Sequence, residues 1–274
     1  MAQVTVNSTQ IDYQEAGSGE VVLLISPGPF RDGFSALTAL PQLTTRFRLI
    51  TYRQRFFNRS TREPVSFVQH ASDAAALLSR LGIDRAHIVG HSTGACIAMQ
   101  LTHDRPDLVA TLSLLEPVLM STPSAPVFLQ KLETAFGAYQ SGDYETAMAR
   151  FMTVASGLQW EQCRDAVERH IPGAMRQAVA DADNCFESYL VELGRWSFGA
   201  QEATTITKPV LSVVGTLTDP LFGEGHDLLR QWFPQVEEHW IEGIGHLLQL
   251  EAPELVADAI AAFCVKHPVA VAVS

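Results

Sequence analysis

The segment that most constrains this chain is Ala86–Cys96, in which an apolar run leads into the pentapeptide Gly90–Gly94 and small residues follow. A strand, a Gly-x-Ser-x-Gly turn and a helix in this order hold the serine in a strained backbone conformation above the end of the sheet. The glycines fit because a side chain at either position would crowd so tight a turn. Ser92 is therefore the candidate nucleophile. The alternative interpretation is an ordinary loop rich in glycine and serine.

Strands and helices alternate on both sides of this turn. Residues 3–15 predict a hairpin, and Val21–Ile25 is a continuous apolar run typical of a strand buried on both faces of a parallel sheet. Ser66 predicts the start of a helix whose apolar positions recur at three- and four-residue steps up to Gly82. The other expected strands are 47–52, 112–115, 209–215 and 237–241, and the other expected helices are 35–45, the segment up to His103, 227–232 and 253–265. The pattern predicts an α/β fold with a mostly parallel, doubly wound sheet.

Between about residues 119 and 200 the strand signal disappears, and apolar residues follow helical spacing. We therefore expect residues 1–118 and 201–274 to form a core domain and residues 119–200 to form an inserted helical cap. Open α/β sheets bind ligands at the carboxyl ends of their strands, and the cap is expected there. Although most apolar residues of a cap serve packing, the candidates to line a substrate pocket are Phe30, His91, Phe128, Met152, Trp160 and Trp196.

Composition narrows the classes of function. The net charge of −11 and the lack of a Lys and Arg stripe argue against a nucleic-acid partner. The first residues do not follow the pattern of a signal peptide, and no apolar run is long enough for a membrane span, so we expect a cytoplasmic protein without a membrane partner. The four cysteines lack Cys-x-x-Cys spacing and the nine histidines lack a His-Glu-x-x-His cluster, which predicts neither a metal site nor a cofactor.

The chain resembles the α/β-hydrolase superfamily almost from end to end. The resemblance rests on the Gly-x-Ser-x-Gly turn, the alternating strands and helices and the inserted cap. A serine at its ordinary pKa is a poor nucleophile, and it needs a base that a carboxylate holds in place. The resemblance implies that this base follows the last strand, where the sequence reads Gly243-Ile244-Gly245-His246. His246 is therefore the expected general base, and a histidine in a surface loop is the alternative.

Two carboxylates compete for the third position of the triad. The resemblance allows an acid after strand 209–215, where Asp219 lies one residue later than expected, or an acid after strand 112–115, where Glu116 follows directly. An ionised Glu at the end of an apolar strand is costly unless it is paired, whereas Asp219 before Pro220 also suits a helix cap. We favour Glu116. Zearalenone-type lactone hydrolases of this superfamily carry their acid at a similar spacing from the serine.

The oxyanion region departs from the superfamily's common His-Gly sequence, because Ser26-Pro27-Gly28-Pro29-Phe30 stands there. Proline has no N–H to donate, so the donor is the N–H of Gly28 or of Phe30, together with the N–H of Thr93. Gly28 is the first choice, and the lactone hydrolases named above also have a glycine here.

The resemblance implies a serine hydrolase that cleaves a carboxylic ester or a lactone through an acyl-enzyme intermediate. The apolar cap favours a small hydrophobic substrate as its partner, and a homodimer stays open. Aspartate-dependent dehalogenases and epoxide hydrolases share only the fold, because the residue here is serine. Carbon–carbon hydrolases, thioesterases and a non-catalytic ligand-binding protein remain as alternatives, since fold does not choose among them.

Overall fold

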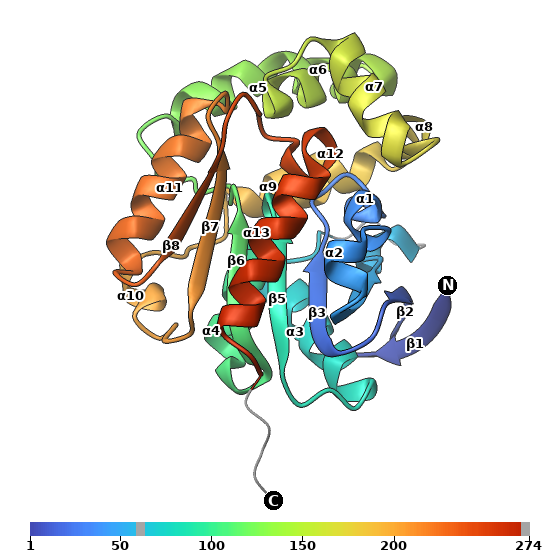
Figure 1. The fold of residues 1–274 in the computed structure, drawn as a ribbon. Helices are drawn as coiled ribbons and strands as arrows, with labels where there is room; N and C mark the ends of the chain where they lie inside the picture. Colours follow the sequence, from blue (N-terminus) through green and yellow to red (C-terminus); the bar gives the residue numbers. More distant parts are fainter. Residues whose placement is uncertain (59–63, 270–274) are drawn as a thin grey trace, which may run out of the picture.

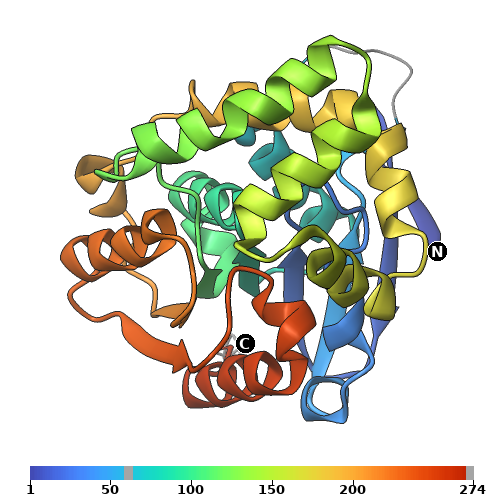
Figure 2. The same ribbon diagram turned by 90° about the horizontal axis from the view of Figure 1, so that it is seen from above.

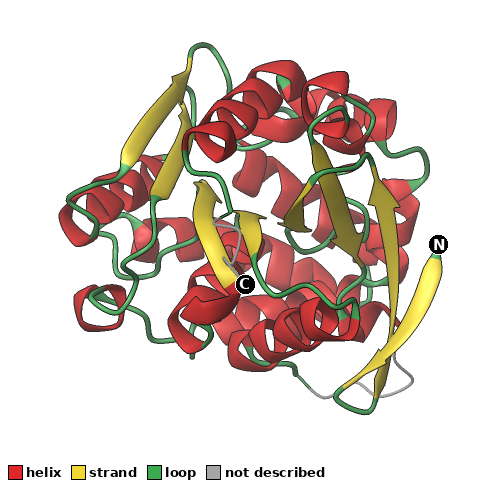
Figure 3. Cartoon of the chain, turned by 60° about the horizontal axis from the view of Figure 1, so that its bottom comes forward, coloured by secondary structure: helices red, strands yellow, loops and turns green. Residues whose placement is uncertain are grey.

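The computed structural model describes residues 1–58 and 64–269 and shows an eight-stranded sheet with helices on both faces (Figures 1 and 3). The order in the sheet is β1-β2-β4-β3-β5-β6-β7-β8. β1 pairs with β2 and β2 pairs with β4 in antiparallel fashion, and every other pairing is parallel. The strands are β1 Ala2–Val6, β2 Thr9–Ala16, β3 Glu20–Ile25, β4 Phe47–Tyr52, β5 Ala86–His91, β6 Val109–Leu115, β7 Val210–Gly215 and β8 Glu237–Ile241. The predicted α/β fold with a mostly parallel sheet is confirmed.

The middle of the sheet is buried on both faces. Every residue of β5 and of β7 is buried, as the continuous apolar runs in the sequence indicate. Helix α4 (Thr93–Asp104) packs against β5, β6 and α3 (Phe67–Arg80). Helix α13 (Pro253–Lys266) lies on the opposite face, in contact with the two short helices α1 (Ser35–Thr38) and α2 (Pro41–Thr44). The expected start of α3 is present, since Ser66 Oγ accepts a hydrogen bond from Gln69 N at 3.1 Å.

One expected helix is broken in two. The sequence predicts a single helix over 35–45, but the structure has α1 (Ser35–Thr38) and α2 (Pro41–Thr44) with a break between them. Leu40 is extended, with ψ 127°. The cause is Pro41, whose ring clashes with a helical conformation of the preceding residue.

The segment between β6 and β7 contains helices and no strand. Figure 1 shows its first four helices above the carboxyl ends of the parallel strands, whereas its last helix lies near the start of β7. Its elements are α5 Ala125–Gln140, α6 Tyr144–Ser156, α7 Trp160–His170, α8 Ala174–Ala180, the π-helical turn η3 Asn184–Tyr189, α9 Leu190–Leu193 and α10 Ala200–Ala203. Seen from above, α5 and α6 cross the top of the molecule side by side (Figure 2). We keep the word cap for residues 119–200, the boundaries that the sequence predicts.

The helical spacing in the cap sequence is evident over residues 128–139, 144–152, 175–183 and 187–196, so helix α7 has no counterpart in the prediction. Its buried residues are Cys163 and Val167, so it carries no broad apolar stripe. The other short or late elements are η1 Arg55–Asn58, η2 Pro106–Leu108, α11 Pro220–Trp232 and α12 Leu248–Glu251. In the described part of the chain, no helix has the length and apolar character needed to cross a bilayer.

Candidate active site

The turn that carries Ser92 has the strained geometry that its sequence predicts. Ser92 lies between β5 and α4 with φ 55° and ψ −124°, and its N–H donates to the carbonyl oxygen of Leu115 at 2.9 Å. A Cβ on Gly90 would lie 2.3 Å from the carbonyl oxygen of Gly94, and a Cβ on Gly94 would lie 2.2 Å from that of Ile25. Both positions therefore require glycine, and the strain at Ser92 is held by the backbone around it.

The structure brings His246 and Glu116 together. His246 lies in the loop between β8 and α12, and its Nδ1 donates to Glu116 Oε2 at 2.6 Å. Glu116 follows the last residue of β6 with φ 45°, and it is 1% exposed. Its carboxylate also accepts hydrogen bonds from Gly215 N and Thr218 Oγ1, each at 2.8 Å. The donors of three residues thus fix one carboxylate against the imidazole.

Asp219, the alternative acid, is occupied elsewhere. Its Oδ1 accepts a hydrogen bond from Leu221 N at 3.0 Å and caps the N-terminus of α11. Its Oδ2 pairs with the ammonium group of Lys131, which comes from α5 of the cap. Of the two candidates, Glu116 is the one whose carboxylate accepts a hydrogen bond from His246.

Burial controls the charges in this cluster. It lowers the pKa of His246 to about 3, against a smaller opposing effect of the Asp219 carboxylate, and so favours a neutral imidazole. With the proton on Nδ1 directed at Glu116, Nε2 is the ring atom that can accept a proton. Burial raises the pKa of Glu116 to about 7, and the hydrogen bonds from Gly215 and Thr218 oppose this change.

His91, a predicted pocket residue, lies behind the base. Its Nε2 donates to the backbone carbonyl oxygen of His246 at 2.8 Å, and its Nδ1 accepts from Gln249 Nε2 at 3.0 Å. Burial, followed by the neighbouring His246, lowers the pKa of His91 to about 3. His91 is therefore a neutral side chain that anchors the backbone of His246, in a place where it is 1% exposed.

The two backbone N–H groups predicted as oxyanion donors in the loop after β3 each donate a hydrogen bond to another atom of the protein. Gly28 N–H donates to Thr93 Oγ1 at 3.0 Å, and Phe30 N–H donates to the carbonyl oxygen of Pro27 at 3.2 Å. Thr93 is the first residue of α4, so its own N–H has no acceptor within the helix. The two predicted partners, Gly28 and Thr93, are thus in contact, but through the side chain of Thr93.

Residues of the cap hold this loop from above. The ring of Tyr189 packs so closely on Gly28 that a Cβ there would lie 2.4 Å from Cδ2 of the ring. The Tyr189 hydroxyl donates to Gln54 Oε1, and Gln54 Nε2 donates to the carbonyl oxygen of Ser26 at 2.9 Å. These contacts make Gly28 a position where only glycine fits.

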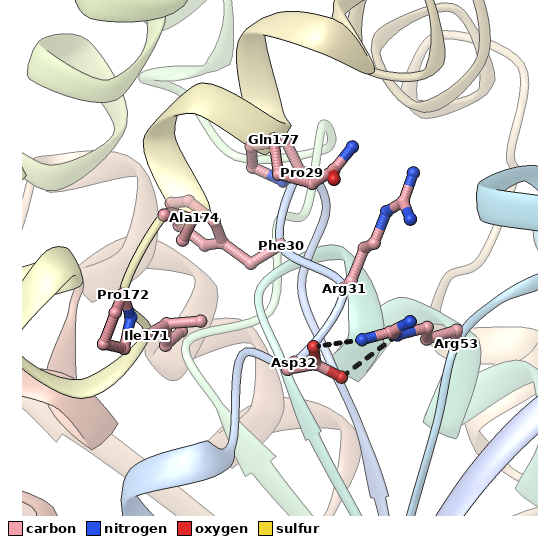
Figure 4. Close-up of a pocket in the computed structure, with 10 residues that line it drawn as sticks. Pro29, Phe30, Arg31, Asp32, Arg53, Ile171, Pro172, Ala174 and Gln177 are labelled. Atoms are coloured by element: carbon pink, nitrogen blue, oxygen red, sulfur yellow. Dashed lines mark hydrogen bonds and ion pairs between the residues drawn. The ribbon is translucent and has the colours of Figure 1, made fainter. Parts of the chain in front are cut away.

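A small pocket of about 220 Å³ opens on the outer side of the same loop, between Pro29–Asp32 and the turn that joins α7 to α8 (Figure 4). Phe30, a predicted lining residue, contributes to this pocket. Asp32 and Arg53 form an ion pair at its edge, with 2.8 Å between Arg53 Nη2 and Asp32 Oδ2. Arg31 forms a second ion pair, with Asp181 at 2.8 Å, which ties the loop to the cap.

The remaining predicted pocket residues are dispersed. Phe128 packs edge-on against Phe222, with 6.0 Å between ring centroids, and Met152 is buried in the core cluster. Trp160 lines a pocket of about 650 Å³ formed by α6, α7 and α8. Trp196 donates to Gln100 Oε1 at 2.9 Å and stacks on Phe198. Their assignment to a substrate pocket stays a prediction.

Phe222 is a site residue that sequence reasoning missed. Its ring stacks on the imidazole of His246, with 3.7 Å between centroids and 13° between planes. Phe222 lies in the first turn of α11, and its N–H donates to the carbonyl oxygen of Asp219 at 2.9 Å. The Asp219-Pro220 pair is a helix-start signal that would have placed this turn, and with it Phe222, beside the base.

Residues 1–58 and 64–269 contain no cluster of His, Cys, Asp and Glu suited to hold a metal ion. The four cysteines are buried and free, and burial raises the pKa of the Cys96 thiol to about 12. Burial thus disfavours the thiolate form of Cys96, which is the nucleophilic form of a cysteine.

Comparison with known proteins identifies the family to which the fold belongs. Residues 27–253 match the family model of the alpha/beta hydrolase fold. The chain belongs to this family. The family groups proteins of different activities, so membership establishes the architecture and leaves the substrate open.

The individual relatives carry different names. RutD of Caulobacter vibrioides, whose name proposes carbamate hydrolysis, is 36% identical over 119 residues, which are 41% of this chain and 44% of the relative. The match thus spans less than half of that relative's length. A soluble epoxide hydrolase of Corynebacterium sp. is 24% identical over 95% of this chain and 96% of its own. The structure of Est816, titled as an N-acyl homoserine lactone degrading enzyme, is 24% identical with a TM-score of 0.70, over 96% of this chain and 100% of that one, a likeness of fold alone.

Proposed function

We propose that this protein is a serine hydrolase that cleaves a carboxylic ester or a lactone of a small hydrophobic molecule. The observation that carries the proposal is the 2.6 Å hydrogen bond from His246 Nδ1 to Glu116, in a chain that also holds Ser92 in the strained turn after β5. A serine in the turn after β5 favours acyl transfer over the epoxide chemistry in the name of the Corynebacterium relative. The superfamily resemblance implies an aspartate nucleophile for epoxide hydrolases.

In the proposed reaction, Ser92 Oγ attacks the substrate carbonyl while His246 Nε2 takes its proton. The imidazolium that forms is stabilised by Glu116, which Gly215 and Thr218 hold in place. The oxyanion forms beside Gly28 and Thr93 at the N-terminus of α4, where backbone N–H groups favour negative charge. His246 then protonates the leaving alcohol. In the second half of the reaction, water attacks the acyl-enzyme and gives a proton to His246, which returns it to Ser92 Oγ as the acid product leaves.

The apolar surroundings of the base support a hydrophobic substrate. Phe222 covers one face of the His246 ring, and Phe128 of the cap packs on Phe222. In the Figure 4 pocket, Arg31 and Arg53 are each paired with an aspartate, and this pairing offsets their positive charge and disfavours an anionic head group. An aryl or alkyl ester, or an aromatic lactone, suits this chemistry better than a phosphorylated metabolite.

The test is hydrolysis of p-nitrophenyl acetate and butyrate, with a panel of aromatic lactones, by the wild type and by Ser92→Ala. The proposal predicts turnover that is lost in Ser92→Ala while the circular dichroism spectrum is unchanged. Faster turnover of the lactones would select lactones as the substrate class. A folded wild type that hydrolyses neither panel would contradict the proposal and favour carbon–carbon cleavage, thioester cleavage or ligand binding.

A further inference from the structure

The contact between Gly28 and Thr93 bears on how the oxyanion would be held. A direct role of Gly28 requires its N–H to point at the substrate oxygen, 2.7–3.1 Å away in typical oxyanion holes. In the structure this N–H points at Thr93 Oγ1, 3.0 Å away, and the amide of Phe30 is turned toward Pro27. The two candidate amides of the loop are therefore both engaged within the protein.

The hydroxyl group of Thr93 is left with a proton to donate. In the part of the chain that the structure describes, Thr93 Oγ1 makes one hydrogen bond, in which it is the acceptor. Thr93 is 6% exposed, so bulk water offers little compensation. A hydroxyl that accepts a hydrogen bond is a better donor, because hydrogen bonds in a chain polarise one another. This hydroxyl therefore has a proton to donate, on the residue that directly follows Ser92 in the sequence.

We infer that the Thr93 hydroxyl donates to the oxyanion, together with the Thr93 backbone N–H, and that Gly28 acts by orienting this hydroxyl. The inference rests on the proposed serine hydrolase reaction and assigns a catalytic role to a side chain in it. Gly28 is well suited to orient the hydroxyl, because the ring of Tyr189 and the link from Gln54 to Ser26 hold its loop. Two successive hydrogen bonds, from Gly28 N–H to Thr93 Oγ1 and from the Thr93 hydroxyl to the substrate oxygen, then form without a rearrangement of the backbone.

Thr93→Val separates the two arrangements because they predict opposite results. Valine keeps the shape of threonine but lacks the hydroxyl, so the Gly28 N–H loses its acceptor. If the hydroxyl is the donor, kcat for p-nitrophenyl butyrate falls by about 10²- to 10³-fold with KM changed by less than about threefold, the usual effect of removing one oxyanion donor. If Gly28 donates directly, the released N–H leaves kcat equal or higher, and that result would overturn the inference.

Two further variants complete the design. Thr93→Ser retains the hydroxyl and is expected to keep kcat within about tenfold of the wild type, as a donor role requires. Thr102→Val is the matched control, because Thr102 is a buried threonine near the other end of α4 whose hydroxyl donates to Ala98 O at 2.7 Å. If Thr93→Val does not fold, Thr93→Ala against Thr93→Ser gives the same comparison. Equal losses in Thr93→Ser and Thr93→Val would refute the hydroxyl as donor.

A trifluoromethyl ketone, whose adduct with Ser92 carries an oxyanion, gives a second readout. Its inhibition constant should rise in Thr93→Val by the same factor as kcat/KM falls, whereas a merely structural role of Thr93 would not link the two. Wild type against Ser92→Ala is measured in the same series. Absence of serine-dependent turnover in the wild type would contradict the proposed function, while normal turnover in a folded Thr93→Val would contradict this inference alone.

Discussion

Replacement of Glu116 by glutamine tests the assignment of the acid most directly, because the structure predicts how the amide must lie. Gly215 N–H donates to Oε1 and cannot turn, since it belongs to the backbone of β7. The amide oxygen of glutamine must therefore face Gly215, and the NH₂ group must take the place of Oε2. In the wild type, Oε2 of Glu116 accepts hydrogen bonds from Thr218 Oγ1 and from His246 Nδ1.

The NH₂ group then meets two donors. The Thr218 hydroxyl can rotate and accept, but His246 Nδ1 can accept only if the imidazole proton moves to Nε2. In that tautomer Nε2 has no lone pair for the proton of Ser92. We therefore expect kcat to fall by about 10⁴-fold, as when the buried aspartate of a serine protease triad becomes asparagine. The loss corresponds to about 5 kcal/mol of transition-state stabilisation, and KM should change little because Glu116 is 1% exposed.

Asp219→Asn is the matched control, since it removes the charge of the alternative acid. Asparagine caps a helix about as well as aspartate, and the ion pair with the half-exposed Lys131 contributes little. We expect kcat within about threefold of the wild type and a loss of less than about 1 kcal/mol in the free energy of unfolding. Steady-state kinetics on a p-nitrophenyl ester and urea unfolding measure both. An inactive Asp219→Asn beside an active Glu116→Gln would refute the reasoning.

Two other perturbations follow from the same contacts. Gly28→Ala places a Cβ 2.4 Å from the Tyr189 ring and should lower the free energy of unfolding by about 1–3 kcal/mol and reduce kcat. Gly223→Ala should do neither, because a Cβ there would meet no atom within 4 Å apart from its chain neighbours and the backbone of its own helix; equal urea midpoints for the two variants would contradict this. The pKa of His91 is about 3 in the folded protein and about 6.5 in the unfolded chain. Between these pH values the unfolded state binds more protons than the folded state, so the contribution of His91 to the free energy of unfolding falls as the pH drops below about 6.5. The stability difference between wild type and His91→Gln should therefore shrink by up to about 1.4 kcal/mol per pH unit in urea unfolding from pH 7 to 5, and a constant difference would refute a neutral His91.

Much of the fold was predictable because its signals are local. Continuous apolar runs such as Val21–Ile25 can be covered only as buried strands, and Ser66 caps α3 as expected. The errors are local as well. The break between α1 and α2 follows from Pro41, and a stricter use of the proline rule would have found it. Helix α7 is mostly polar and charged, so its narrow apolar stripe around Cys163 and Val167 was missed.

The acid of the triad could not be assigned from the sequence alone, because its position depends on the register of β6 and β7 in the sheet. Glu116 and Asp219 each follow a strand of the sheet, so order along the chain does not separate them. β6 and β7 are parallel neighbours with Leu115 opposite Val213, which places the carboxylate of Glu116 beside the amide of Gly215 and the loop that follows it. Asp219 comes far enough beyond the strand to begin α11 instead. A difference of a few residues after a strand end thus changes a candidate acid into a helix cap.

The oxyanion donors are the part of the site that is hardest to predict from the sequence, because residues distant in sequence determine where a backbone N–H points. Pro27 and Pro29 are excluded as donors by their chemistry alone, and that step needed no structure. Where Gly28 N–H points depends on Thr93, 65 positions later, and on Tyr189, which comes from the cap. The sequence shows a threonine after the nucleophile but not that its hydroxyl reaches back to the loop. A sequence with valine at this position would keep the same Gly-x-Ser-x-Gly pattern and, if the hydroxyl is the donor, would lack one of the groups that stabilise the transition state.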